Sequence, residues 1–122
     1  MDRLFATLGS ISALIAVAAG AFGAHALRAR LAPDLLAVFE TGARYQMYHA
    51  LGLLGVAWIA SRSPSPLAAW AGWLLVLGTV LFSGSLYALA LSGIRIFGAI
   101  TPLGGLAFMA GWICLALAAR RM

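Results

Sequence analysis

Long apolar runs follow one another along this chain, and short polar breaks separate them. Four runs predict membrane-spanning helices, at residues 4–24, 45–60, 67–91 and 97–119. A helix needs about 20 apolar residues to cross a bilayer, so the second span has to include residues before Tyr45. Serine, proline, glycine and arginine at residues 61–66 and 92–95 form the later breaks. We therefore expect one domain, residues 1–122, that is an all-α integral membrane protein: four transmembrane helices in a compact bundle with short loops.

The beginning of the second helix has its own signal. Pro33 and Asp34 are typical of a first helical turn, because proline fits there and an acid favours the positive end of a helix. The residues that follow have an amphipathic pattern. We expect one or two interfacial turns here, which bend into the second span at Gly42.

The few polar residues are placed unevenly between the two halves of the predicted bundle. With four spans, both termini and the break at 61–66 lie on one side, and the breaks at 28–34 and 92–95 lie on the other. Each span then carries its polar residues toward this second side, whereas the opposite half is almost purely apolar. The sequence predicts one polar layer in a single leaflet, with these binding candidates: His25, Glu40, Arg44, Tyr45, Gln46, Tyr48, His49, Ser83, Ser85, Arg95 and Thr101.

Composition narrows the class of protein. Apolar residues make up 64% of the chain and charged residues only 9%, too few charges for the surface of a soluble domain. The net charge is +5, but the arginines stand at the ends of apolar runs, where they meet lipid headgroups. No basic stripe lies on a polar domain, so we expect no nucleic-acid partner.

The arginines also bear on orientation. Four lie on each side of the predicted bundle, so the positive-inside rule gives a tie; discounting Arg44 as embedded in a helix favours cytoplasmic termini. The first run has a basic start and an Ala24-His25-Ala26 sequence, as in a signal peptide. It is nevertheless about 30 Å long as a helix, so we expect an uncleaved span.

Two pairs of residues four positions apart are candidates for chemistry. Glu40 and Arg44 are expected to contact each other, either as a structural pair or as part of a headgroup, anion or proton site. Tyr45 and His49 share another face, and His25 is placed to face them from the first span. Two histidines at one depth suggest a haem or metal site, but with no cysteine partner this is a weak ligand set. The other interpretation is that each histidine is hydrogen-bonded to a tyrosine, a serine or a backbone carbonyl.

An enzyme is not expected. The sequence around Ser83 and Ser85 lacks the second glycine and the strand of a nucleophile elbow. No phosphate loop or dinucleotide fingerprint is present, and we expect no cofactor. Small residues spaced by four, such as Ala16, Gly20 and Ala24, favour close helix packing, either within the chain or between copies.

Four motifs resemble one known family. They are residues 20–27 (GAFGAHAL), 39–50 (FETGARYQMYHA), 81–87 (LFSGSLY) and 98–105 (GAITPLGG). Together they are similar to the YgdD-like membrane proteins, domain-of-unknown-function family 423, which has a mitochondrial branch in animals. The resemblance covers essentially the whole chain. It implies a multi-pass four-span bundle in a bacterial inner (plasma) membrane, with its motif residues on the predicted polar layer, and it implies no activity.

We therefore expect a non-enzymatic membrane module whose polar layer engages a lipid headgroup or a partner. The layer is net positive, and Arg28, Arg30 and Arg95 add to it, so an anionic headgroup fits better than a cation. An oligomeric channel or transporter for a small solute or proton is the alternative, and a haem or metal protein is the second alternative. A homo-oligomer or a larger membrane complex stays open.

Overall fold

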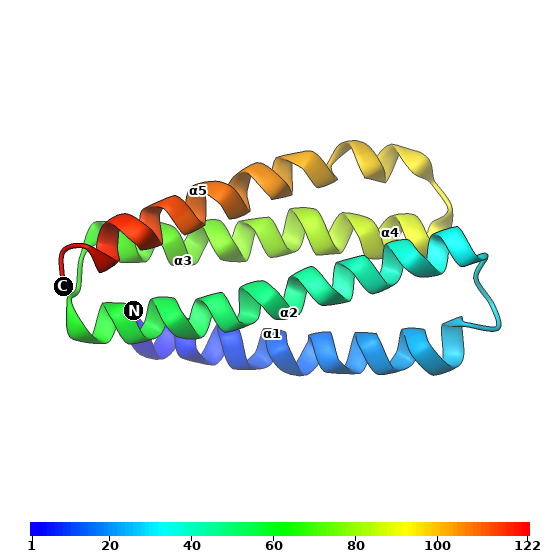
Figure 1. Cartoon of the computed structure of the whole chain (residues 1–122). Coiled ribbons are helices and arrows are strands. Elements are labelled where there is room, and N and C mark those ends of the chain that lie inside the picture. The colour runs from blue at the N-terminus through cyan, green and yellow to red at the C-terminus, as the bar shows by residue number, and fades with distance from the viewer.

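The computed structural model describes residues 1–122 and is helical throughout, apart from short connections. Its elements are α1 (Asp2–Phe22), η1 (Gly23–Leu27), α2 (Pro33–Arg62), α3 (Pro66–Gly78), η2 (Thr79–Ser83), α4 (Gly84–Ser92), η3 (Arg95–Ala99) and α5 (Thr101–Ala119). The π-helical turn η1 prolongs α1, and the π-helical turn η2 joins α3 to α4, so four long rods result. They run up and down, with both termini and the α2–α3 connection at one end (Figure 1). The all-α class and the side assigned to each connection are thus confirmed.

Three of the four rods are long and apolar enough to span a membrane. They are Asp2–Leu27, Pro66–Ser92 and Arg95–Ala119, with mean hydropathies of 2.0, 2.1 and 1.8. The fourth rod, α2, is 30 residues long but carries two acids and two arginines. Its polar content, rather than its length, sets it apart.

The second helix differs from its predicted form. It begins at Pro33 with Asp34 in its first turn, as expected, but it then continues as one helix to Arg62. No separate interfacial turn ends at Gly42. This glycine instead lies against the Tyr87 ring, since a Cβ at this position would be 2.9 Å from the Tyr87 Cε1.

Local signals explain where the other rods begin and end. The Ser65 Oγ accepts a hydrogen bond from the Ala68 amide at 3.2 Å and caps α3, whose first residue is Pro66. Gly93 follows α4 with a φ of 72°, a left-handed conformation that only glycine adopts at no steric cost. These residues form the two breaks that the sequence predicts.

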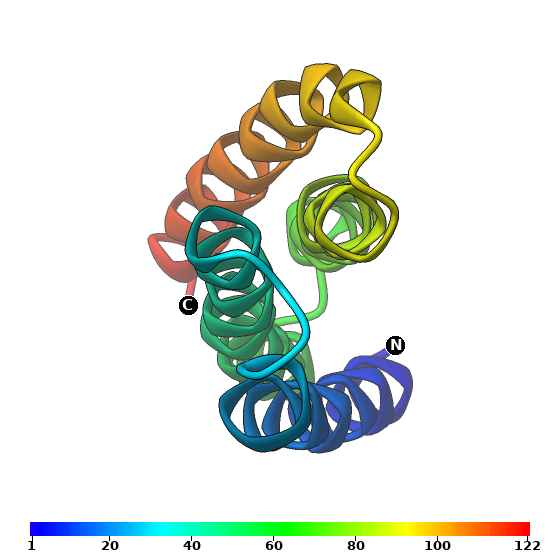
Figure 2. The same cartoon turned by 90° about the vertical axis from the view of Figure 1, so that its right-hand side faces the viewer.

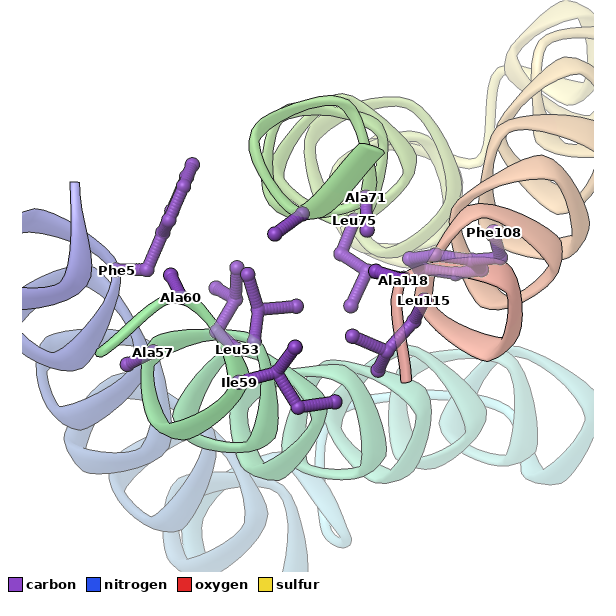
Figure 3. Close-up of a cluster of buried hydrophobic side chains, with 12 residues drawn as sticks. Phe5, Leu53, Ala57, Ile59, Ala60, Ala71, Leu75, Phe108, Leu115 and Ala118 are labelled. Carbon is purple, nitrogen blue, oxygen red and sulfur yellow. The ribbon is translucent and has the colours of Figure 1, made fainter. Parts of the chain in front are cut away.

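The apolar core lies toward the end that holds the termini. Phe5, Leu53, Leu75 and Phe108 are among its 12 buried residues, which come from all four rods (Figure 3). In the end-on view, α2 lies between α1 on one side and α5 with α3–α4 on the other (Figure 2). Near this end, Phe5 bridges from α1 to α3, where its ring centroid lies 5.3 Å from that of Trp73. The terminal half of the bundle is thus closed by hydrocarbon side chains.

Candidate functional site

Gln46 is the centre of a buried hydrogen-bonded cluster. Its side chain is 5% exposed, and its Nε2 donates to the Ser12 carbonyl at 3.2 Å and to the Ser12 Oγ at 3.3 Å. The Tyr87 hydroxyl donates to the Gln46 Oε1 at 2.6 Å. One amide therefore connects α1, α2 and α4. In hydrocarbon, where water supplies no alternative partner, such bonds fix how helices align.

Ser83 makes a second connection between α2 and the α3–α4 rod. Its Oγ donates to the Gly42 carbonyl at 2.7 Å, and the side chain is 1% exposed. Gly42 lies one helical turn before Gln46 on the same face of α2. Because Gly42 has no side chain, the Tyr87 ring can pass it and reach Gln46.

Ser85 makes a third connection, to α5. Its Oγ lies 2.6 Å from the Thr101 Oγ1 and also donates to the Phe82 carbonyl at 2.9 Å. The backbones approach closely nearby, because a Cβ at Gly104 would be 2.7 Å from the Phe82 Cβ. We name Ser12, Gln46, Ser83, Ser85, Tyr87 and Thr101 the polar cluster. Every buried side-chain nitrogen and oxygen atom in the structure has a hydrogen-bond partner.

His49 is buried beside this cluster and belongs to the aromatic packing. Its ring stacks on the Phe108 ring with centroids 3.4 Å apart and planes 3° apart. Its Nδ1 lies 2.6 Å from the Tyr45 carbonyl, which confirms the predicted backbone partner. Tyr45 packs on Phe82 with ring centroids 4.8 Å apart.

The expectation that His25 faces His49 from the first span is wrong. His25 is exposed in η1, close to the loop, and makes no side-chain hydrogen bond. Gly23 packs beside Phe39, and His49 lies ten residues farther along α2, about 15 Å along the axis. The two histidines therefore cannot hold one haem iron within one chain. No group of three or more histidine, cysteine or acidic side chains is placed to hold a metal ion.

The predicted contact between Glu40 and Arg44 is also not formed. Arg44 is exposed and Glu40 half-buried, and neither has an ion-pair or hydrogen-bond partner. Arg95 instead lies 3.5 Å from Asp34, with both side chains largely exposed. Tyr48 is 50% exposed.

The single predicted layer is therefore divided in two. Gln46, Ser83, Ser85 and Thr101 meet in the polar cluster, together with Tyr87 and Ser12. Ser12 and Tyr87 are absent from the predicted candidates. The remaining candidates lie in the aromatic packing or on the outer surface: His25, Glu40, Arg44, Tyr45, Tyr48, His49 and Arg95.

An apolar groove runs along α1 on the side that faces the α3–α4 rod. Its first part is a cavity of about 240 Å³ between Leu8 and Ile15 of α1 and Val76 and Val80 of the opposite rod, with Gln46 at its base. Its second part, of about 390 Å³, shares Ile15 and is lined only by hydrophobic residues, including Tyr87. The two parts follow α1 from Leu8 to Phe22, a length of about 21 Å. We name them together the α1 groove.

Comparison with known proteins places the chain in a family. The model described as "Protein of unknown function (DUF423)" matches residues 19–105. The UPF0382 membrane protein YwdK of Bacillus subtilis is 52% identical, and the match covers 96% of each chain. A UPF0382 membrane protein of Staphylococcus haemolyticus is also 52% identical, over 93% of this chain and 92% of its own.

Another UPF0382 membrane protein, from Staphylococcus aureus strain USA300, is 47% identical over 95% of this chain. No solved structure matches this chain. The relatives and the three apolar rods together identify a multi-pass membrane protein. The predicted resemblance is thereby confirmed: the chain belongs to the DUF423 family of membrane proteins of unknown function, whose bacterial relatives are named UPF0382.

Proposed function

We propose that this protein is a non-enzymatic module of the bacterial plasma membrane that binds an anionic lipid. One acyl chain lies in the α1 groove, and the headgroup lies beside Arg28 and Arg30. The observation that carries the proposal is the groove itself, which is apolar and runs along the side of the bundle rather than through it.

The proposal includes a fourth crossing by α2. The end of α1 and the beginning of α3 lie at opposite ends of the molecule (Figure 1). If α1 and α3–α4 cross the bilayer, the helix that joins them has to cross as well. At about 1.5 Å per residue, the 30 residues of α2 extend about 45 Å, more than the roughly 30 Å of a hydrocarbon core. Arg44 then lies within the membrane and does not count toward orientation, which favours cytoplasmic termini.

The dimensions of the α1 groove suit a lipid chain. One leaflet contributes about 15 Å of the hydrocarbon core, and the groove is about 21 Å long. The polar atoms of Gln46 at its base are already bonded to Ser12 and Tyr87. An acyl chain can therefore lie over them without leaving a polar group unpaired.

The charges near the loop end of the groove select the sign of the headgroup. Arg28 and Arg30 are exposed and follow directly after η1, about 9 Å beyond Phe22, where the groove ends. Neither has an acidic partner, whereas Arg95 is partly neutralised by Asp34. Two free arginines at the membrane surface attract anionic lipid.

The test compares thermal stability in micelles that contain phosphatidylglycerol or phosphatidylcholine. We expect phosphatidylglycerol to raise the melting temperature more. The double variant Arg28→Gln/Arg30→Gln should remove most of this difference, and Arg120→Gln/Arg121→Gln, which removes two charges at the other end, should not. Ala18→Phe fills the groove and should have the same effect as the loop variant. Its control is Ala24→Phe, an exposed position outside the groove and about 120° away around the rod.

Equal stabilisation of the wild type by both lipids would refute the proposal. Solute flux through liposomes that contain the protein, together with such equality, would favour the transport alternative. The apolar core of the terminal half argues against a polar path there, since Phe5, Leu53 and Leu115 fill it.

A further inference from the structure

Two opposite charges on α2 have no partner within the chain. Arg44 lies eleven residues after Pro33, about 16 Å along the helix, and Glu40 lies one turn nearer its start. Arg44 is exposed and Glu40 half-buried, and neither forms an ion pair or a hydrogen bond. With α2 crossing the membrane, both lie where ionisable groups are costly unless something pairs with them.

Both charges belong to one stripe on the outer face of α2. With about 100° per residue, positions 37, 40, 44, 48, 51 and 55 lie within about 40° of Arg44, whereas Gln46 lies on the opposite face. Every member of this stripe is exposed or half-buried, including Tyr48 and Leu51 at 50% and 56%. The stripe therefore has no cover in the isolated chain, and it faces away from the polar cluster and the α1 groove.

Gly55 lies on the same stripe and leaves the helix backbone there open to a neighbouring helix. A Cβ at Gly55 would have no neighbouring atom within 4 Å, so no packing inside the chain requires a glycine there. Glycine lowers the stability of a helix interior compared with alanine. In membranes, small residues are typical of positions where two helix backbones approach closely.

We propose that the partner is a second copy of this chain, packed in parallel through α2. Two copies inserted in the same orientation place equal residues at equal depth. Around a two-fold axis, Glu40 of each copy then lies one turn from the partner's Arg44, and two reciprocal ion pairs form. The stripe on one copy is therefore complementary in charge to the same stripe on a second copy. Nothing requires a lipid or an unrelated helix to match this stripe in the same way. The inference rests on the crossing of α2 and is independent of lipid binding in the α1 groove.

Mixing two charge variants separates this contact from a pair within one helix. Arg44→Glu chains carry acids at both positions, and Glu40→Arg chains carry arginines at both. Each variant should lose self-association, because all four charges at the contact then have the same sign. Co-expressed with different affinity tags, the two variants should associate with one another, since every facing pair is then opposite in charge. An ion pair within one helix cannot be restored by mixing chains.

Cysteine cross-linking places the contact on α2. In a Cys114→Ser background, we expect Leu51→Cys to form disulfide-linked dimers under mild oxidation in native membranes. Leu103→Cys, on the outer face of α5 and equally exposed, is the control. Equal cross-linking at both positions would overturn the proposal. Failure of the two charge variants to associate with each other, while the wild type associates, would overturn it as well.

Discussion

The bond between Gln46 and Tyr87 offers a direct measurement of what the polar cluster contributes to stability. Tyr87→Phe removes the hydroxyl that lies 2.6 Å from the Gln46 Oε1 and leaves the ring in place. Hydrogen bonds between membrane helices average about 0.6 kcal/mol and reach about 1.7 kcal/mol. We expect a value in the upper half of this range, because the bond is short and Gln46 is 5% exposed.

Gln46→Leu should cost more than Tyr87→Phe. It removes the bonds to Ser12 as well, and it leaves the Tyr87 hydroxyl without its acceptor, a loss of about 1–3 kcal/mol in the free energy of unfolding. In the double variant no hydroxyl remains to be orphaned. Its loss should therefore be smaller than the sum of the two single losses, by about 0.6–1.7 kcal/mol.

The assay is reversible unfolding in mixed micelles with increasing sodium dodecyl sulfate, read by circular dichroism. Tyr48→Phe is the control, since its hydroxyl has no protein partner and its side chain is half exposed. Single losses that add within about 0.3 kcal/mol would refute the reasoning, because uncoupled residues behave in that way.

Three further predictions use the same unfolding assay. Gly42→Ala should lower the free energy of unfolding by about 1–3 kcal/mol, since the new Cβ would lie 2.9 Å from the Tyr87 ring; Gly20→Ala, with no atom within 4 Å, should raise it by up to about 1 kcal/mol. Ser85→Ala should cost about 0.6 kcal/mol through its bond to Thr101, and a loss equal to that of Gly42→Ala would contradict this ranking. Arg95→Ala should cost between 0 and about 1 kcal/mol, less at high salt, because its pair with Asp34 is exposed; a cost that salt leaves unchanged would contradict this.

Features that depend on residues close together in the sequence could be predicted from the sequence. The apolar runs predict the rods, and the breaks with Pro66 and Gly93 predict where two of them begin and end. Pro33 and Asp34 predict the start of α2. Once the rods are known to alternate in direction, the side on which each connection lies follows without knowledge of any contact.

The depth of His49 could not be predicted, because the apolar run at 45–60 is too short to cross a bilayer and does not show how far the span extends before Tyr45. His49 lies one helical turn after Tyr45, where this run begins. It lies sixteen residues after Pro33, about 24 Å along α2, which continues as one helix past Gly42. His25 lies near the loop, so the two histidines lie at different depths along the bundle.

The division of the polar layer into two faces has a rotational cause. Arg44 and Gln46 are two residues apart and therefore point about 160° away from each other around α2. The sequence predicts a similar depth for both residues and therefore one layer, but only Gln46 faces the bundle. Ser12 is a partner from 34 residues away, and finding it requires the alignment of α1 against α2, which no local pattern supplies.

Polar groups that have a hydrogen-bond partner and charged groups that have none play different roles in this bundle. The polar cluster has its hydrogen-bond partners, so a ligand that bound there would have to break bonds between Gln46, Ser12 and Tyr87. Its hydrogen bonds join each rod to α2 or α4, as expected of residues that fix the alignment of the helices. Arg28, Arg30, Glu40 and Arg44, in contrast, have no partner in the chain. Charged side chains that have no partner within a membrane protein are the first residues to test for recognition of a lipid or of another chain.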